Sequence, residues 1–129
     1  MEFKWIPKTS YGIFKMGFPL SKKARELLEF EPEEDSTNWM KFRMRDEEIL
    51  VFTENDKIVS IACYKEFYIR GVNIIGLKLS EAIKQIGEEP EKKVDEIEMD
   101  DSVQMVYEFE DAQLQLWTKK GRVVTVFTN

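Results

Sequence analysis

The chain has 129 residues, of which 43% are hydrophobic and 34% are charged, a composition typical of a single soluble globular domain. It contains no histidine and one cysteine, Cys63. An intramolecular disulfide, Ser-His-Asp or Cys-His catalysis, and any zinc site that needs imidazole are therefore excluded. The net charge of −6 repels phosphate backbones and disfavours nucleic acid as a partner.

The first half of the chain predicts an extended segment, a short helix and three strands. Gly12 and Gly17 flank the extended segment. Apolar residues at helical spacing predict the helix, namely Leu20, Ala24, Leu27 and Leu28. Alternation at Met40, Phe42 and Met44 predicts the first strand, and Glu54-Asn55-Asp56 is expected to form a hairpin turn. The last strand is expected over Ile58–Tyr64, with a possible extension to Tyr68.

The second half predicts the same order of elements. Its helix is expected from a second apolar stripe, which is Leu79, Ala82, Ile83 and Ile86, and Gly87 and Pro90 are expected to end it. Met105, Tyr107 and Phe109 alternate as Met40, Phe42 and Met44 do. Lys119-Lys120-Gly121 is typical of a hairpin turn, and the final strand is expected over Arg122–Thr128.

These similarities indicate an internal duplication. Residues 40–61 align without gaps on residues 105–126, and the glycine-containing segments and helices upstream align as well. We therefore expect one domain, 1–129, made of two copies at about 12–68 and 71–129. The predicted fold class is α+β, a tandem duplication of a helix plus an antiparallel β-meander, with the helices on one side of the sheet and the other face open.

The segment from Gly76 to Pro90, followed by a meander with a Lys-Gly turn, resembles the repeat unit of the BamE-like and beta-lactamase-inhibitor-protein-like proteins. The resemblance implies an extended sheet with helices on one side and an exposed sheet face that binds other proteins, and it contributes no catalytic residues. The chain departs from that pattern at Lys78, where the family has a capping threonine, and at Glu31, near the expected breaking glycine.

Strand alternation predicts one binding surface on the sheet face away from the helices. The polar glutamines beside Trp117 indicate that this ring faces solvent, and the internal alignment places Phe52 at the equivalent position. Exposed aromatic rings among basic and amide side chains are typical of a protein-binding hot spot. The candidate residues are Trp39, Lys41, Arg43, Phe52, Gln115 and Trp117. The alternative is that the N-terminal segment Phe3-Lys-Trp5-Ile covers these rings.

An acidic run forms a second candidate surface. It comprises Asp95, Glu96, Glu98, Asp100 and Asp101. The run lacks the spacing and the distal glutamate of a calcium loop, and its alternation favours an edge strand with charged outward positions. A solvated face is the simplest interpretation. The remaining alternative is an acidic surface that binds a basic partner.

No motif in the chain is built for catalysis. Phosphate-binding loops are absent, no cleft is predicted around paired carboxylates, and Cys63 lies in an apolar run typical of a buried thiol. We therefore expect no cofactor, no metal site and no enzyme activity.

The expected function is a non-catalytic protein-binding module, specifically a small acidic inhibitor or immunity-type protein that neutralises a protein partner, with a basic partner allowed by the charge. The alternative is an envelope-associated structural adaptor like the BamE-like lipoproteins. Because no leader or membrane-spanning run is recognised, a cytoplasmic protein with no membrane partner is expected. We also expect a monomer or a weak homodimer, the latter formed through Arg122–Thr128 as an edge strand.

Overall fold

The computed structural model describes residues 4–31, 39–44, 46, 48–91, 94–99 and 102–129. Its main feature is one antiparallel sheet of eight strands. These strands are β4 (Glu29–Glu31), β5 (Met40–Met44), β6 (Ile49–Glu54), β7 (Lys57–Cys63), β10 (Asp95–Met99), β11 (Ser102–Phe109), β12 (Leu114–Lys119) and β13 (Arg122–Thr128). Their order across the sheet is β10-β11-β12-β13-β7-β6-β5-β4.

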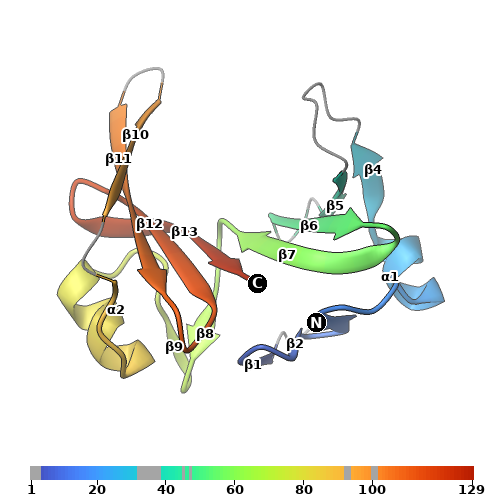
Figure 1. Cartoon of the computed structure of the whole chain (residues 1–129), viewed down its shortest axis with the longest axis horizontal. Helices are drawn as coiled ribbons and strands as arrows, with labels where there is room; N and C mark the ends of the chain where they lie inside the picture. The colour runs from blue at the N-terminus through green and yellow to red at the C-terminus, as the bar shows by residue number, and fades with distance from the viewer. Residues whose placement is uncertain (1–3, 32–38, 45, 47, 92–93, 100–101) are drawn as a thin grey trace.

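The remaining elements are small and lie on one side of this sheet (Figure 1). A three-stranded sheet consists of β1 (Trp5–Ile6), β2 (Ser10–Tyr11) and β3 (Phe14–Lys15), and a hairpin consists of β8 (Tyr68–Ile69) and β9 (Val72–Asn73). The helices are α1 (Lys22–Leu27) and α2 (Leu79–Ile86). The two ends of the large sheet bend toward the opposite side, so that face lies on the inside of the curve (Figure 1).

The predicted α+β class, with helices forming a layer on one side of the sheet, is wrong. Strands make up 51% of the structure and helices only 12%. The helices are six and eight residues long, too short to form a layer, and their buried residues are Ala24 and Ala82. The small sheets and connecting segments cover most of the core face instead, because they supply Tyr11, Phe14 and Phe67 to the core. The protein is a mostly β structure.

The bounds of two predicted elements and the position of a third differ in the structure. The first helix ends at Leu27 and not at Leu28, and Glu29–Glu31 continues as β4. The strand predicted to reach Tyr68 ends at Cys63, and Tyr68–Ile69 belongs to a separate hairpin. The strand Arg122–Thr128, proposed as a free edge, lies between β12 and β7 in the interior of the sheet, so it is not available for dimerisation.

The order of a helix followed by four antiparallel strands occurs twice, with matching strand register. Met40 pairs with Thr53 and Met44 with Ile49, as Met105 pairs with Thr118 and Phe109 with Leu114. Each copy also has a β-bulge at the same position, after Phe52 in one and after Trp117 in the other.

The extended segments before the helices are also attached in the same way. Gly17 N–H donates to the carbonyl of Ile58, and Ile58 N–H donates to that of Phe18. In the second copy, Gly76 N–H donates to Val123 and Val123 N–H to Leu77. Backbone hydrogen bonds thus fix the entry of each helix to the last strand of its own copy.

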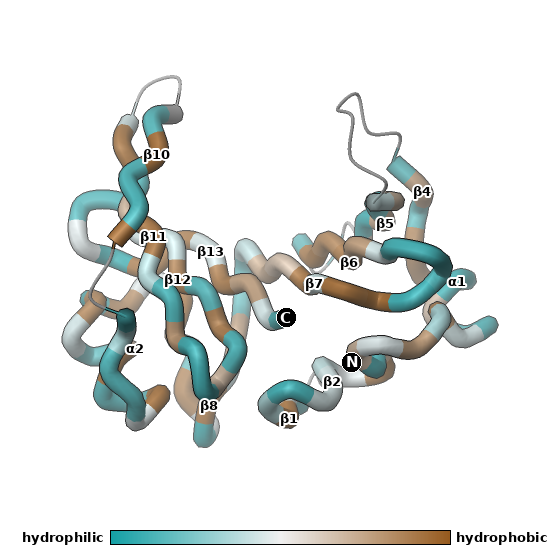
Figure 2. The backbone as a smooth tube through the Cα atoms, viewed as in Figure 1, coloured by the Kyte–Doolittle hydropathy of each residue, from teal (hydrophilic) through white to brown (hydrophobic). Residues whose placement is uncertain are grey.

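The two copies meet at the centre of the sheet, where β7 pairs with β13. Val126 pairs with Cys63, Phe127 with Ala62 and Thr128 with Ile61. Because Val126 is the counterpart of Ile61 and Thr128 of Cys63, this pairing is symmetric about the Phe127–Ala62 pair. Most of β7 is hydrophobic (Figure 2), and Ile61, Ala62 and Val126 are fully buried at this junction.

The two helices begin differently. In α1 the Ser21 hydroxyl accepts a hydrogen bond from Ala24 N–H at 3.1 Å, which satisfies one of the free N–H groups of the first turn. In α2 the same position is Lys78, whose side chain makes no capping hydrogen bond. At the other end, Gly87 adopts φ 81° and closes α2 through a hydrogen bond to Ile83, as the sequence predicted.

Replacing Lys78 by serine is expected to raise the free energy of unfolding by about 1 kcal/mol. Lys78 already has extended backbone angles, and Glu81 stands three residues later, so serine would complete a reciprocal cap with that glutamate. Urea denaturation measures the change. A matched control is Lys84→Ser in the last turn of α2, which lowers stability by a few tenths of a kcal/mol. An unchanged or lower stability for Lys78→Ser would contradict the prediction.

Candidate binding surface

We call the side of the eight-stranded sheet that faces away from the helices and small sheets the open face. Four aromatic rings form a row across it. Trp39, just before β5, lies 5.8 Å from Phe52, Phe52 lies 6.5 Å from Phe127, and Phe127 lies 5.6 Å from Trp117, measured between ring centroids. Their spacing is that of interacting aromatic pairs. The row passes from the first copy of the repeat to the second.

Small side chains let the row cross the centre of the sheet. Ser60 stands opposite Phe52, and Ala62 stands opposite Phe127. Both are buried, because the larger rings on the neighbouring strands extend over β7. Trp39 is 39% exposed, and Phe52, Phe127 and Trp117 are half-buried. The rings are thus packed against one another while part of each remains accessible.

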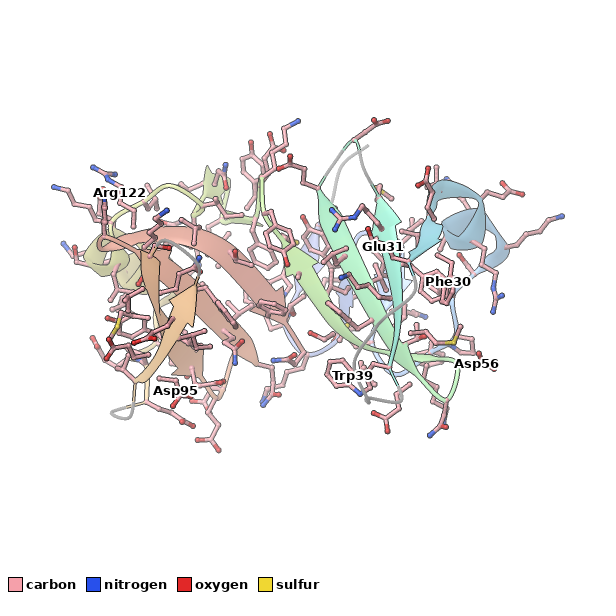
Figure 3. The ribbon with its side chains drawn as sticks, turned by 90° about the horizontal axis from the view of Figure 1, so that it is seen from above. Phe30, Glu31, Trp39, Asp56, Asp95 and Arg122 are labelled. Atoms are coloured by element: carbon pink, nitrogen blue, oxygen red, sulfur yellow. The ribbon has the colours of Figure 1, made fainter. Side chains whose placement is uncertain are left out.

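The structure brings the residues predicted for this surface together on the open face. Lys41 pairs with Phe52 across β5 and β6, and Arg43 is two residues further along β5. Gln115 and Trp117 lie on β12 in the second copy. Figure 3 looks down on this face, with Trp39 and Glu31 over one half of the sheet and Asp95 at the far edge of the other.

Trp5 and Ile6 of the N-terminal segment do not cover the aromatic row, contrary to the alternative prediction. The indole N–H of Trp5 donates to the Thr128 hydroxyl at 3.2 Å, and its ring lies 5.4 Å from Phe67. Thr128 faces the core, since it pairs with Leu114 and Ile61. Trp5 therefore packs on the opposite side of the sheet from Trp117. Phe3 lies outside the described residues.

Hydrogen bonds orient the two indole rings at the ends of the row. Trp39 donates its N–H to the Glu54 carboxylate at 2.6 Å. Trp117 donates to the side-chain oxygen of Gln115 at 2.7 Å, and Gln115 in turn donates to the Glu108 carboxylate at 2.5 Å. Each indole N–H is thus satisfied within the protein, and these hydrogen bonds fix the orientation of both rings.

The basic residues of the open face are already paired. Arg43 donates to Glu31 at 2.8 Å, and the Lys41 ammonium lies 3.6 Å from the other oxygen of the same carboxylate. The hydrogen bond from Arg43 lowers the pKa of Glu31, and the same bond raises the pKa of Arg43. Burial raises the pKa of Tyr64, which lies near Arg43 at the end of β7. This group holds β4 against β5 at one margin of the row.

The acidic candidates lie only partly within the described residues. β10, which carries Asp95, Glu96 and Glu98, is an edge strand as predicted. Asp95 and Glu96 point to opposite faces, since they pair with successive residues of β11. Asp100 and Asp101 lie outside the described residues. Within the described ranges, no three acidic or cysteine side chains gather in a way that could hold a metal ion.

The sequence predictions omitted Phe127, Glu54 and Glu108, which also lie on the open face. Phe127 was missed because of the β-bulge in β12 and β13. A regular hairpin would place Val126 opposite Gln115, but the bulge shifts the register so that Phe127 is opposite instead. Val59 and Val124 are the extra residues of the two bulges, and valine is equally common in regular strands, so the sequence offers no signal for the shift. Glu54 and Glu108 carried no signal beyond strand alternation.

Comparisons of the chain with family models, with curated proteins and with solved structures find no match. The resemblance to the BamE-like and beta-lactamase-inhibitor-protein-like repeat thus stays a prediction. Cys63 is buried as predicted and is therefore inaccessible to a substrate. None of the described helices combines the length and the apolar character that crossing a bilayer requires.

Proposed function

We propose that the protein is a non-catalytic binding module that uses the open face to hold and neutralise another protein, as a small inhibitor or immunity-type protein does. The observation that supports this proposal most directly is the row of four aromatic rings from Trp39 to Trp117. Tryptophan is the residue most enriched in binding hot spots, and a fixed ring loses little entropy when a partner packs on it.

The surroundings of the row favour a protein over a small ligand. The rings cross four neighbouring strands, β6, β7, β13 and β12, together with the chain before β5. Charged and amide side chains surround them, including Lys41, Arg43, Glu108 and Gln115. An apolar centre within a polar rim is the usual composition of a protein–protein interface. A small-molecule site would instead require a concave pocket that encloses most of its ligand.

Replacing Trp39 and Trp117 together by serine is expected to weaken binding of the natural partner by more than about 100-fold, because two hot-spot rings are lost. The partner is first recovered on the immobilised full chain from cells of its source and then titrated against each variant by calorimetry. The control is Tyr68→Ser, which removes a ring that is 45% exposed but lies on the β8–β9 hairpin. If the natural partner bound the double variant and the unmodified chain with equal affinity, the open face would be ruled out as its binding site.

A further inference from the structure

Two carboxylates on the open face form no ion pair with another described residue. Glu54 accepts the indole N–H of Trp39, and Glu108 accepts the amide N–H of Gln115. Both donors are neutral, so these hydrogen bonds orient the carboxylates without cancelling their charge. Glu31 differs, because Arg43 and Lys41 both lie against it. Each end of the aromatic row therefore carries a carboxylate that is not held in an ion pair, and Lys57 stands opposite Glu54 in the register of β6 and β7.

Each of these carboxylates accompanies an indole ring. Glu54 is bonded directly to Trp39, and Glu108 is joined to Trp117 through Gln115. The hydrogen bonds engage the ring edges at the indole N–H, while Trp39 remains 39% exposed and Trp117 partly exposed. The face of an indole attracts a cation, and a nearby carboxylate adds a charge-assisted hydrogen bond. A planar guanidinium can stack on the ring and bind the carboxylate, whereas an ammonium group acts as a point charge.

We propose that the two ends of the row bind arginine side chains of a basic protein partner, one at Trp39 and Glu54 and the other at Trp117 and Glu108. This inference rests on the proposed function, since it specifies the chemistry of the partner that the open face binds. A purely apolar partner would remove both carboxylates from water without compensation, which is costly. An acidic partner, or a phosphate backbone, would be repelled by them.

The probe is a nine-residue peptide that alternates arginine with serine, compared with a peptide in which citrulline replaces every arginine. Citrulline keeps the shape of the side chain and removes its charge. Binding to the full chain is followed by tryptophan fluorescence and calorimetry. The arginine peptide is expected to bind at least about tenfold more tightly than the citrulline peptide. Without the positive charge, the citrulline peptide loses two cation–ring contacts and two ion pairs.

Replacing one carboxylate at a time tests where on the open face the arginine peptide binds. Glu54→Gln and Glu108→Gln are each expected to lower the affinity for the arginine peptide about threefold to fivefold. The matched controls are Glu26→Gln on α1 and Glu96→Gln on β10, which change the net charge equally but lie away from the aromatic row. The controls are expected to stay within about twofold of the unmodified chain, because isolated surface charges contribute little.

Three outcomes would overturn the inference. They are equal affinity for the arginine and citrulline peptides, no binding of the arginine peptide at about 1 mM, and equal weakening by the controls and by Glu54→Gln and Glu108→Gln. None of these would contradict the proposed function, which depends on whether Trp39 and Trp117 are needed to hold the natural partner. Loss of the natural partner in the double tryptophan variant, with no preference for arginine, would retain the function and reject this partner chemistry.

Discussion

Replacing Phe67 by alanine is expected to lower the free energy of unfolding by about 3–5 kcal/mol. Its ring is fully buried, stacks on Tyr11 at 5.2 Å and lies 5.4 Å from Trp5. It therefore joins the N-terminal three-stranded sheet to the segment between the two copies. Alanine would leave a cavity where three aromatic rings meet, and rings held at the edges of small sheets cannot close it without breaking strand pairs.

Thermal and urea unfolding measure this loss. Phe67→Leu retains most of the buried volume and is expected to lose less than half as much stability as the alanine variant. The neighbouring substitution Tyr68→Ala changes a ring that is 45% exposed and is expected to stay within about 0.5 kcal/mol. If Phe67→Ala cost no more than Tyr68→Ala, the N-terminal sheet would contribute nothing to the core.

Stability at alkaline pH is expected to depend on Cys63. Burial raises the pKa of its thiol from 9.0 to about 12, and a hydrogen bond with Tyr11 offsets a part of this effect. Above pH 9 the unfolded chain releases the thiol proton while the folded protein keeps it. The unfolded state then binds fewer protons, so the free energy of unfolding falls as pH rises, by up to about 1.4 kcal/mol per pH unit until pH 12.

The matched variant is Cys63→Ala, which has no thiol to titrate. Below pH 9 the difference in unfolding free energy between the two proteins is expected to be constant. Between pH 8 and pH 10.5 the unmodified protein is expected to lose about 2 kcal/mol more than the variant. Ionisable groups that do not contact Cys63 are common to both proteins, so their contributions cancel in the comparison. Parallel stability profiles over this range would show that the thiol is not shielded from solvent.

Most strands of each copy could be predicted from the sequence, and their register and the fold class could not. Alternation and the turn residues identify β5, β6, β12 and β13 because each of these strands has one buried face. An apolar stripe predicts that a helix forms but not how much of the core it covers, and the two helices bury only Ala24 and Ala82. The tiny strands of the N-terminal sheet have no period to detect, because two residues define no alternation.

The candidate surface was partly predictable for a related reason. Trp117 and Gln115 lie on one face of one strand, so alternation alone groups them. Placing Phe127 beside them requires the register between β12 and β13, which the bulge shifts by one residue. Only their hydrogen bonds in the folded structure connect the carboxylates of Glu54 and Glu108 to the aromatic row. Interactions between strands depend on three-dimensional register, which local sequence patterns do not encode.

The symmetric pairing of β7 with β13 uses the last strand of both copies, so the outer edges of the sheet are β4 and β10. Both edge strands carry carboxylates, with Glu29 beside the ion-paired Glu31 on β4 and Asp95, Glu96 and Glu98 on β10. Adding another molecule at either edge would align carboxylates of like charge, which opposes strand addition. We therefore expect the sheet to stop growing after two units, so that the molecule remains a discrete particle in solution and does not polymerise into fibres.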